Sequence, residues 1–265
     1  MDGQMFLQGQ LQSKSVNAPI QFNGSDETNC LPVKGSEVNI VTSQGDHDVG
    51  SSKLQIKNIV NFGWEHKYYP GQLVAAHMSG TYIAYAITTP GKGCGVVRVV
   101  NRITDDRLLI KGMRGAVVDL TFAHNKEEVV VGAVDSLGNL FVHRVTEGSN
   151  GLASERVLEV VRDGVEGELH RLVWCPFLPE PVIEREEEQD KSAARLLVLT
   201  HGSKAEIWSL DLVVEKHGTG PLAPVDVEHG LLKILDVGGD IMDAAFSPDG
   251  AALATASGDG KVKFF

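Results

Sequence analysis

The sequence has little cysteine. Its three cysteines, Cys30, Cys94 and Cys175, are odd in number and far apart, and none belongs to a CxxC pair or to a set with metal-ligand spacing. This pattern excludes a disulfide framework and gives no support to a cysteine zinc site. It predicts free thiols in a reducing compartment.

Positive charge and long apolar runs are also scarce. Lysine and arginine number 24 against 35 aspartates and glutamates, which gives a formal net charge of −11. Nucleic acids are held chiefly by cations that neutralise phosphates, so we expect no direct nucleic-acid binding. No apolar stretch reaches the roughly 18 residues that a membrane span needs, and no N-terminal apolar run resembles a signal peptide. We therefore expect no membrane partner and an intracellular protein.

Residue spacings typical of enzymes are absent. The nine histidines are scattered, without HxH or HExxH, and no GxSxG elbow occurs. The glycine-rich stretch at residues 91–95 is followed by a strand pattern, VVRVV, where a phosphate loop needs the start of a helix. These absences predict a protein that is not an enzyme and that carries no cofactor and no metal.

What the chain does contain is turn chemistry, with 29 glycines, arranged most clearly near its C-terminal end. A strand pattern at 241–246 is followed by Ser247-Pro248-Asp249-Gly250, in which proline fixes φ and glycine accepts a positive φ. A second strand at 251–257 leads to Asp259-Gly260, a strong hairpin signal between apolar runs. A third strand follows. Three short strands at such offsets are typical of one β-propeller blade.

The same spacing recurs upstream. The aspartate and phenylalanine of the first strand and the glycine before the third recur in the same order, so that Asp119, Phe122 and Gly138 repeat Asp243, Phe246 and Gly260. Weaker copies read LHRLVWCPF with ARLLVLTHGSKAEIWSL, and GTYIAYAI with GVVRVVNRI. Repeats of about 40–45 residues are typical of propellers. The sequence therefore predicts an all-β propeller with roughly four blades.

The offsets of FSPDG, ATAS and the Asp-Gly turn resemble the WD-repeat family. Repeats of that family often carry a Gly-His pair, whose histidine joins the turn aspartate and a tryptophan in a buried hydrogen-bond network. Here Met113 and Val237 occupy the histidine positions, and only Trp208 stands in a tryptophan place. The resemblance therefore implies the fold with an incomplete polar network.

Several separate segments over residues 53–265 resemble one branch of that family. They are WEHKYY, YIAYAI, LIKGMRGAVVDLTFAH, GNLFV, VWCPFLP and AEIWSLD, and they are similar to the N-terminal propeller of the enhancer-of-mRNA-decapping scaffold family, also called Hedls. That propeller has about seven blades, so the resemblance implies that this chain is an incomplete, truncated one.

The function that the resemblance implies is a non-catalytic scaffold of cytoplasmic processing bodies. Its partners would be the decapping activator and the decapping enzyme, which it helps bring together in 5′-to-3′ mRNA decay. Any oligomerisation would use regions absent here. The alternative is a WD-repeat interaction module of another cytoplasmic assembly, in trafficking or ubiquitin ligation.

Two regions depart from the strand pattern. Residues 1–36 are rich in glutamine, serine and asparagine, which predicts a disordered tail before a partial propeller at 37–265. Acidic residues concentrate at 179–192, PEPVIEREEEQDKS, an insertion in the third blade. One interpretation of this insertion is a docking segment for a basic partner, and the other is a solvated loop.

The candidate partner-binding residues are aromatic. Trp64, Tyr68 and Tyr69 stand together in WEHKYY, just before Pro70-Gly71. Exposed tryptophan and tyrosine anchor protein interfaces, so one interpretation is a partner-binding patch. The other is that the rings pack between blades, because aromatic side chains bury the largest area in a β-domain. The sequence leaves both open.

Overall fold

The computed structural model describes residues 59–265 apart from 61, 89–92, 163–166, 177–194 and 228–230. The chain divides into two units, 1–61 and 62–265, and every helix and strand below belongs to the second. The predicted tail at 1–36 and the acidic insertion at 179–192 lie outside the described residues. In the part of the chain that is described, no helix is long and apolar enough to cross a bilayer.

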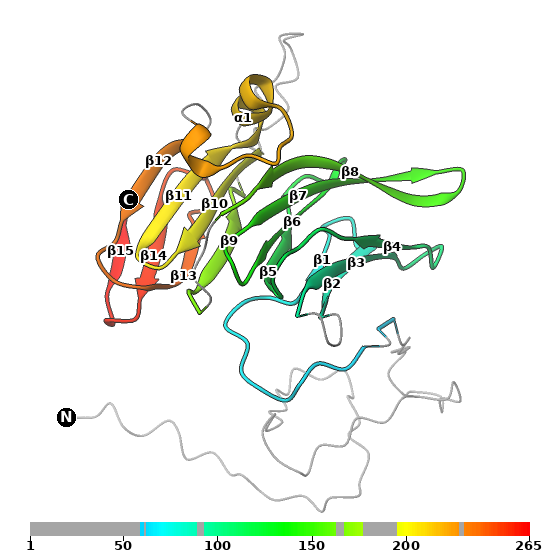
Figure 1. The fold of residues 1–265 in the computed structure, drawn as a ribbon, viewed down its shortest axis with the longest axis horizontal. Helices are drawn as coiled ribbons and strands as arrows, with labels where there is room; N and C mark the ends of the chain where they lie inside the picture. Colours follow the sequence, from blue (N-terminus) through cyan, green and yellow to red (C-terminus); the bar gives the residue numbers. More distant parts are fainter. Residues whose placement is uncertain (1–58, 61, 89–92, 163–166, 177–194, 228–230) are drawn as a thin grey trace, which may run out of the picture. The chain divides into compact units, whose positions relative to one another are not determined.

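The second unit contains four antiparallel sheets, each built from strands that are consecutive in the chain (Figure 1). Sheet 1 consists of β1 (Val74–Ala76), β2 (Tyr82–Thr88), β3 (Gly95–Asn101) and β4 (Arg107–Ile110). Sheet 2 consists of β5 (Val117–Phe122), β6 (Val129–Asp135), β7 (Leu140–Gly148) and β8 (Gly151–Val160). Sheet 3 consists of β9 (His170–Trp174), β10 (Leu196–His201), β11 (Lys204–Ser209) and β12 (Leu231–Asp236). Sheet 4 consists of β13 (Ile241–Phe246), β14 (Leu253–Ser257) and β15 (Val262–Phe264).

The first strands of the sheets bring the sheets together. Strand β5 contacts β1 and β9, and β9 contacts β13, so the sheets follow one another in chain order from cyan to red in Figure 1. Strands β4 and β12 directly precede a new sheet in the chain, yet each pairs as the last strand of the sheet before it. These are the blades of a propeller, and the prediction of an all-β fold with four repeats is confirmed.

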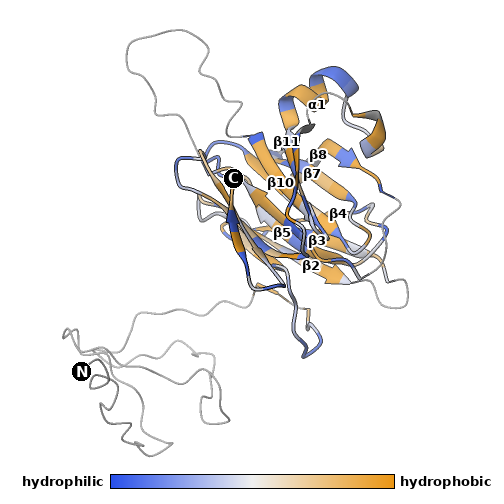
Figure 2. Cartoon of the chain, turned by 90° about the vertical axis from the view of Figure 1, so that its left-hand side faces the viewer, coloured by the Kyte–Doolittle hydropathy of each residue, from blue (hydrophilic) through white to orange (hydrophobic). Residues whose placement is uncertain are grey.

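Apolar side chains fill the space between neighbouring sheets, and Figure 2 shows the hydrophobic colour concentrated along the strands. Alternate residues of a strand point to opposite faces, so each inner sheet supplies two clusters. The buried residues include Ala84, Val97, Leu120 and Phe141 between sheets 1 and 2, Val142, Leu158, Trp174 and Trp208 between sheets 2 and 3, and Val198, Ile241 and Leu253 between sheets 3 and 4. Burial of this apolar area stabilises the arrangement.

Among the described residues, one helix interrupts the β-structure. Helix α1 (Leu210–His217) follows β11 directly, and a 3-10 turn, η2 (Pro224–Asp226), lies between α1 and β12. Leu210 and Val213 lie on one face at helical spacing, and both are buried against sheets 2 and 3. Gly218, with φ of 75°, ends the helix. Burial of that apolar face explains the helix.

Candidate partner-binding surface

Trp64 is fixed against sheet 1. Its indole Nε1 donates a hydrogen bond to the carbonyl oxygen of Ala86 at 3.1 Å. Its ring meets those of Phe62 and Tyr85 edge to face, with centroids 5.5 and 6.2 Å apart. Aromatic pairs at such distances are attractive beyond the area they bury. The segment that carries the predicted site residues is therefore anchored at its beginning.

The two tyrosines of the segment differ in exposure. Tyr69 is half-buried, its hydroxyl donates to the carbonyl oxygen of Glu65 at 3.2 Å, and Lys67 Nζ lies 5.4 Å from the centroid of its ring. Tyr68 is 81% exposed. Of the three predicted residues, Tyr68 presents the most free surface, whereas Trp64 and Tyr69 hold the segment in shape.

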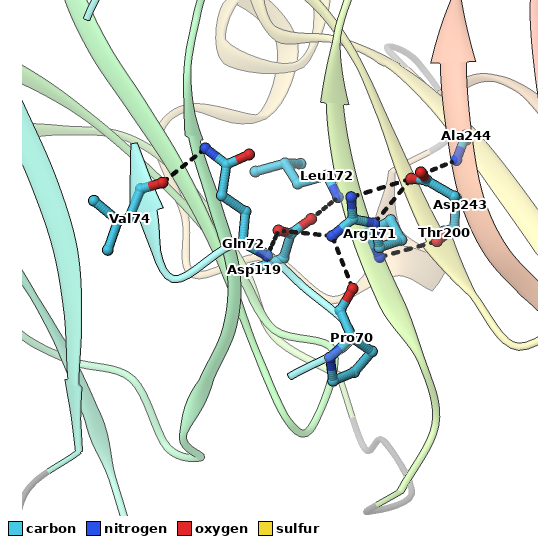
Figure 3. A network of polar contacts seen from close by, with 9 residues as sticks. All are labelled: Pro70, Gln72, Val74, Asp119, Arg171, Leu172, Thr200, Asp243 and Ala244. Carbon is cyan, nitrogen blue, oxygen red and sulfur yellow. Dashed lines mark hydrogen bonds and ion pairs between the residues drawn. The ribbon is translucent and has the colours of Figure 1, made fainter. Parts of the chain in front are cut away.

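The end of the segment is tied to the inner strands, as Figure 3 shows. The carbonyl oxygen of Pro70 accepts a hydrogen bond from Arg171 at 3.3 Å, and the backbone N–H of Gln72 donates to Asp119 at 2.6 Å. Between them, Gly71 passes so close to sheet 2 that a Cβ atom would lie 1.9 Å from the carbonyl oxygen of Val118. Only glycine fits there. Tyr68 is thus presented from a stretch that is fixed on both sides.

Three charged residues hold this point together, because they occupy the same register position in three successive first strands. Asp119 pairs with Val134, Arg171 with Thr200 and Asp243 with Ala256, in each case one pair away from the end of the second strand. Arg171 Nη1 lies 3.2 Å from Asp119 Oδ1, and Arg171 Nε lies 3.1 Å from Asp243 Oδ1 (Figure 3). The alternation of charge links sheets 2, 3 and 4.

The two carboxylates of this cluster lie in different surroundings. Burial raises the pKa of Asp119, and the charge of Arg171 together with the backbone N–H groups of Leu172 and Gln72 opposes that rise. The side chain of Asp119 is 3% exposed and that of Asp243 is 64% exposed. Both carboxylates face the same guanidinium, so the cluster binds the sheets together and leaves Asp243 open to solvent.

A second polar network, centred on Glu206, joins sheets 2 and 3. Arg162 follows β8 and forms a buried bidentate ion pair with Glu206, while Trp208 Nε1 donates to the same carboxylate at 3.0 Å. His201 Nε2 lies 2.8 Å from Glu206 Oε1. Burial alone would raise the pKa of Glu206, but the hydrogen bonds from His201 and Arg162 and the charge of Arg162 outweigh it and lower the pKa to about 2.

Sequence reasoning recognised Trp208 but missed its acceptor, Glu206, and it also missed Asp135. The Asp135 carboxylate accepts the backbone N–H groups of Arg114 and Gly115, both at 3.0 Å, directly after Met113, which stands at the histidine position. It also accepts the side-chain amide of Asn139 at 2.9 Å. The signal for this turn was present in Asp135-Ser-Leu-Gly138, an aspartate followed by a turn glycine.

The buried carboxylates Asp119 and Glu206 are structural in this arrangement. Asp119 and Glu206 each face an arginine and are nearly closed to solvent. Within the described ranges, no three His, Cys, Asp or Glu side chains meet in a way that would hold a metal ion. Cys94 is half-buried, and its Sγ donates to the carbonyl oxygen of Arg114 at 3.4 Å.

The comparison with protein families agrees with the fold. Residues 50–265 match the model described as the WD40 region of Ge1, enhancer of mRNA-decapping protein. The chain belongs to this family. Enhancer of mRNA-decapping protein 4 of Danio rerio is 36% identical over 253 residues, and its homolog of Drosophila melanogaster is 37% identical over 253 residues. Each alignment covers 93% of this chain and 18% of the relative, so the chain spans under a fifth of the length of these relatives.

Among solved structures, the chain is similar to Sqt1 of Chaetomium thermophilum, in a crystal structure bound to the N-terminus of the ribosomal protein L10. The TM-score is 0.52 and the identity 17%, over 72% of this chain and 44% of Sqt1. At this identity the likeness concerns the fold alone. It agrees with the propeller arrangement of the four sheets.

Proposed function

We propose that this chain is a non-catalytic protein-interaction module of the mRNA-decapping machinery, which helps bring the decapping activator and the decapping enzyme together in 5′-to-3′ mRNA decay. The observation that carries the proposal is the family match over residues 50–265, together with 36% identity to enhancer of mRNA-decapping protein 4 over nearly the whole chain. The buried carboxylates Asp119 and Glu206 are each paired with an arginine, which favours a structural role for them over a catalytic one.

The proposed contact with a partner is the aromatic segment, with Tyr68 at its centre. Interfaces draw most of their binding energy from a few aromatic and arginine side chains on a well-fixed backbone. Tyr68 meets this description, because Trp64 anchors the segment on one side and Pro70 anchors it on the other. Trp64 and Tyr69 support the backbone from which Tyr68 projects.

The proposal extends to location and domain organisation. We assign the protein to the cytoplasm and to processing bodies, where decapping factors would gather. The propeller would occupy residues 37–265 with the acidic insertion at 179–192, and residues 1–36 would form a disordered tail. Co-localisation with a decapping enzyme by fluorescence microscopy tests the location, and a diffuse signal in cells that contain such bodies would count against it.

The binding proposal is tested with the purified chain and purified decapping activator and decapping enzyme, by isothermal titration calorimetry. We expect at least one of the two to bind, and Tyr68→Ala to weaken its binding by about tenfold or more. Val225→Ala is the matched control, because Val225 is 87% exposed and lies in η2. Failure of both proteins to bind the unchanged chain would refute the function. Binding that ignores Tyr68→Ala would refute only the aromatic site.

A further inference from the structure

The arginines of the described chain fall into two groups. Outside sheet 1 and the link that follows it, every described arginine forms an ion pair with a carboxylate; these are Arg144, Arg156, Arg162, Arg171 and Arg195. In sheet 1 and its link, none of the arginines has a carboxylate partner among the described residues; these are Arg98, Arg102, Arg107 and Arg114. The described arginines without a carboxylate partner are thus gathered in sheet 1 and the link that follows it.

Two of these arginines share one face of sheet 1, and a lysine lies at its end. Arg98 on β3 lies directly opposite Leu109 on β4, and residues directly opposite each other point to the same face. Arg107 stands two residues before Leu109 in β4, so it points to that face as well, at a diagonal distance of about 7–8 Å from Arg98, and the exposed Lys111 directly follows the end of β4. We call Arg98, Arg107, Leu109 and Lys111 the basic cluster.

The face of the basic cluster points away from sheet 2. Val97 and Ile110, the neighbours of Arg98 and Leu109 in their strands, lie in the core between sheets 1 and 2. Tyr85 pairs with Arg98 and so lies on the same face as the basic cluster, on the inner half of the sheet, where Trp64 packs on it. The outer half therefore carries the cations, beside a part of the sheet that the aromatic segment already covers.

Two features of this face leave polar groups that a partner could bind. The Nε of Arg98 is buried and has no hydrogen-bond partner within the described part of the chain, and a buried donor without a partner is costly. In addition, β4 is the last strand of sheet 1, and no backbone hydrogen bond joins its outer edge to another described strand. A free strand edge is a template for a further strand.

Together these features describe a surface for an extended, acidic peptide. We propose that a partner segment with acidic side chains at alternate positions adds to the edge of β4 and pairs its carboxylates with the basic cluster. Addition of a strand satisfies the free edge and places every second side chain on one face, opposite Arg107 and Lys111. The inference is independent of the decapping role, because it names a different surface and is tested without decapping proteins.

The surface suits an acidic peptide better than RNA. Leu109 is 37% exposed between the cations and Ile103, in the β3–β4 turn, is 70% exposed, so the surface offers apolar contacts that a phosphate backbone does not use. The net charge of −11 also repels a polyanion at long range, whereas a short peptide carries only a few charges.

The test is fluorescence anisotropy with a short synthetic peptide that has glutamate at every second position and threonine or valine between. A peptide of the same composition, with its glutamates in one block, is the sequence control. The variant Arg107→Gln/Lys111→Gln removes the charges, and Lys126→Gln/Lys216→Gln, which changes two exposed lysines elsewhere, matches the change in net charge. Near-UV circular dichroism checks that both variants keep the fold.

We expect the alternating peptide to bind more tightly than the block peptide, and Arg107→Gln/Lys111→Gln to weaken it about tenfold with little effect of the control variant. Equal loss in both variants would mean that net charge alone attracts the peptide, and would overturn the proposal. Tighter binding of a short uridine RNA than of the alternating peptide would overturn it in favour of nucleic acid. No binding of the alternating peptide would mean that the charges only protect the edge of β4.

Discussion

Sheets 2 and 4 are built from the same repeat but differ in burial. Every residue of β6, in the middle of sheet 2, is buried, whereas every residue of β15, the last strand of sheet 4, is exposed. Sheet 2 packs between sheets 1 and 3, and among the described sheets only sheet 3 packs on sheet 4. Yet the turns of sheet 4 match the repeat pattern best. How clearly a repeat can be read in the sequence therefore depends on its turn residues. How deeply its strands are buried depends on how many described sheets pack against it.

The largest difference between the two sheets is expected in their aromatic cores. Phe141 on β7 is 2% exposed, and Phe264 on β15 is 76% exposed. Phe141→Ala should lower the free energy of unfolding by about 3–5 kcal/mol, because it leaves a cavity in the core. Phe264→Ala, its matched control, should change it by less than about 0.5 kcal/mol. Urea unfolding of both variants measures the difference, and similar losses would mean that sheet 4 is packed as fully as sheet 2.

The equivalent aspartates of the two sheets give a second comparison. Asp119→Ala leaves the buried N–H of Leu172 and the part-buried N–H of Gln72 without their acceptor, and we expect a loss of about 3 kcal/mol in the free energy of unfolding. Asp243→Ala removes a solvent-exposed partner of Arg171 and should cost less than about 1 kcal/mol. Thermal unfolding of the two variants ranks them. A larger loss for Asp243→Ala would contradict the view that the cluster is held from the sheet 2 side.

Buried and exposed ion pairs should also differ in how much stability they lose as the pH falls. The pKa of Glu206 is about 2 in the folded chain against an ordinary 4.5, so its ion pairs contribute stability above pH 4.5 that is lost as pH falls toward 2. The shift corresponds to about 3 kcal/mol. Glu206→Gln should lower the free energy of unfolding at neutral pH and make its decrease between pH 4.5 and 2 smaller. Urea unfolding at a series of pH values measures both effects.

The control for Glu206 is the exposed pair of Asp259 and Lys261 in sheet 4. Hydrogen bonding to Lys261 lowers the pKa of Asp259, so the sign of its effect is the same, but solvent screens the pair. Asp259→Asn should therefore leave the loss of stability between about pH 4.5 and 2 close to that of the unchanged chain. If Glu206→Gln also left this loss of stability unchanged, the network between sheets 2 and 3 would not be the main acid-sensitive contact.

How far the sequence predicts this molecule depends on the range of each interaction. The strands and turns of sheet 4 and the match between Asp119 and Asp243 followed from local spacing, and the structure places both aspartates after a register shift. The third repeat has Arg171 at that position, and its role was not predictable because it depends on carboxylates 52 and 72 residues away. The ion pair of Arg162 with Glu206 spans 44 residues and was missed for the same reason.

The candidate site was predicted only in part. The motif WEHKYY indicated an aromatic segment: Trp64 packs on sheet 1 and Tyr68 is open to solvent, and the partner-binding role of Tyr68 stays a proposal. Nothing in the sequence distinguished the two rings, because exposure depends on where the segment is tied. Those ties are the bonds of Pro70 and Gln72 to sheets 3 and 2.

The smallest expected effect concerns the turn glycines that the sequence identified as equivalent. Gly138 and Gly260 both have a positive φ, 77° and 82°, which costs an L-residue about 1–2 kcal/mol. A Cβ atom on Gly260 would meet nothing within 4 Å, whereas one on Gly138 would lie 3.0 Å from His170 Cε1. Gly260→Ala should therefore lose only the backbone term, and Gly138→Ala should lose more, because His170 is buried and has little room to move. Equal losses in the free energy of unfolding, measured in urea, would mean that His170 moves aside at no cost. The contact between sheets 2 and 3 would then add nothing to the strain of the turn.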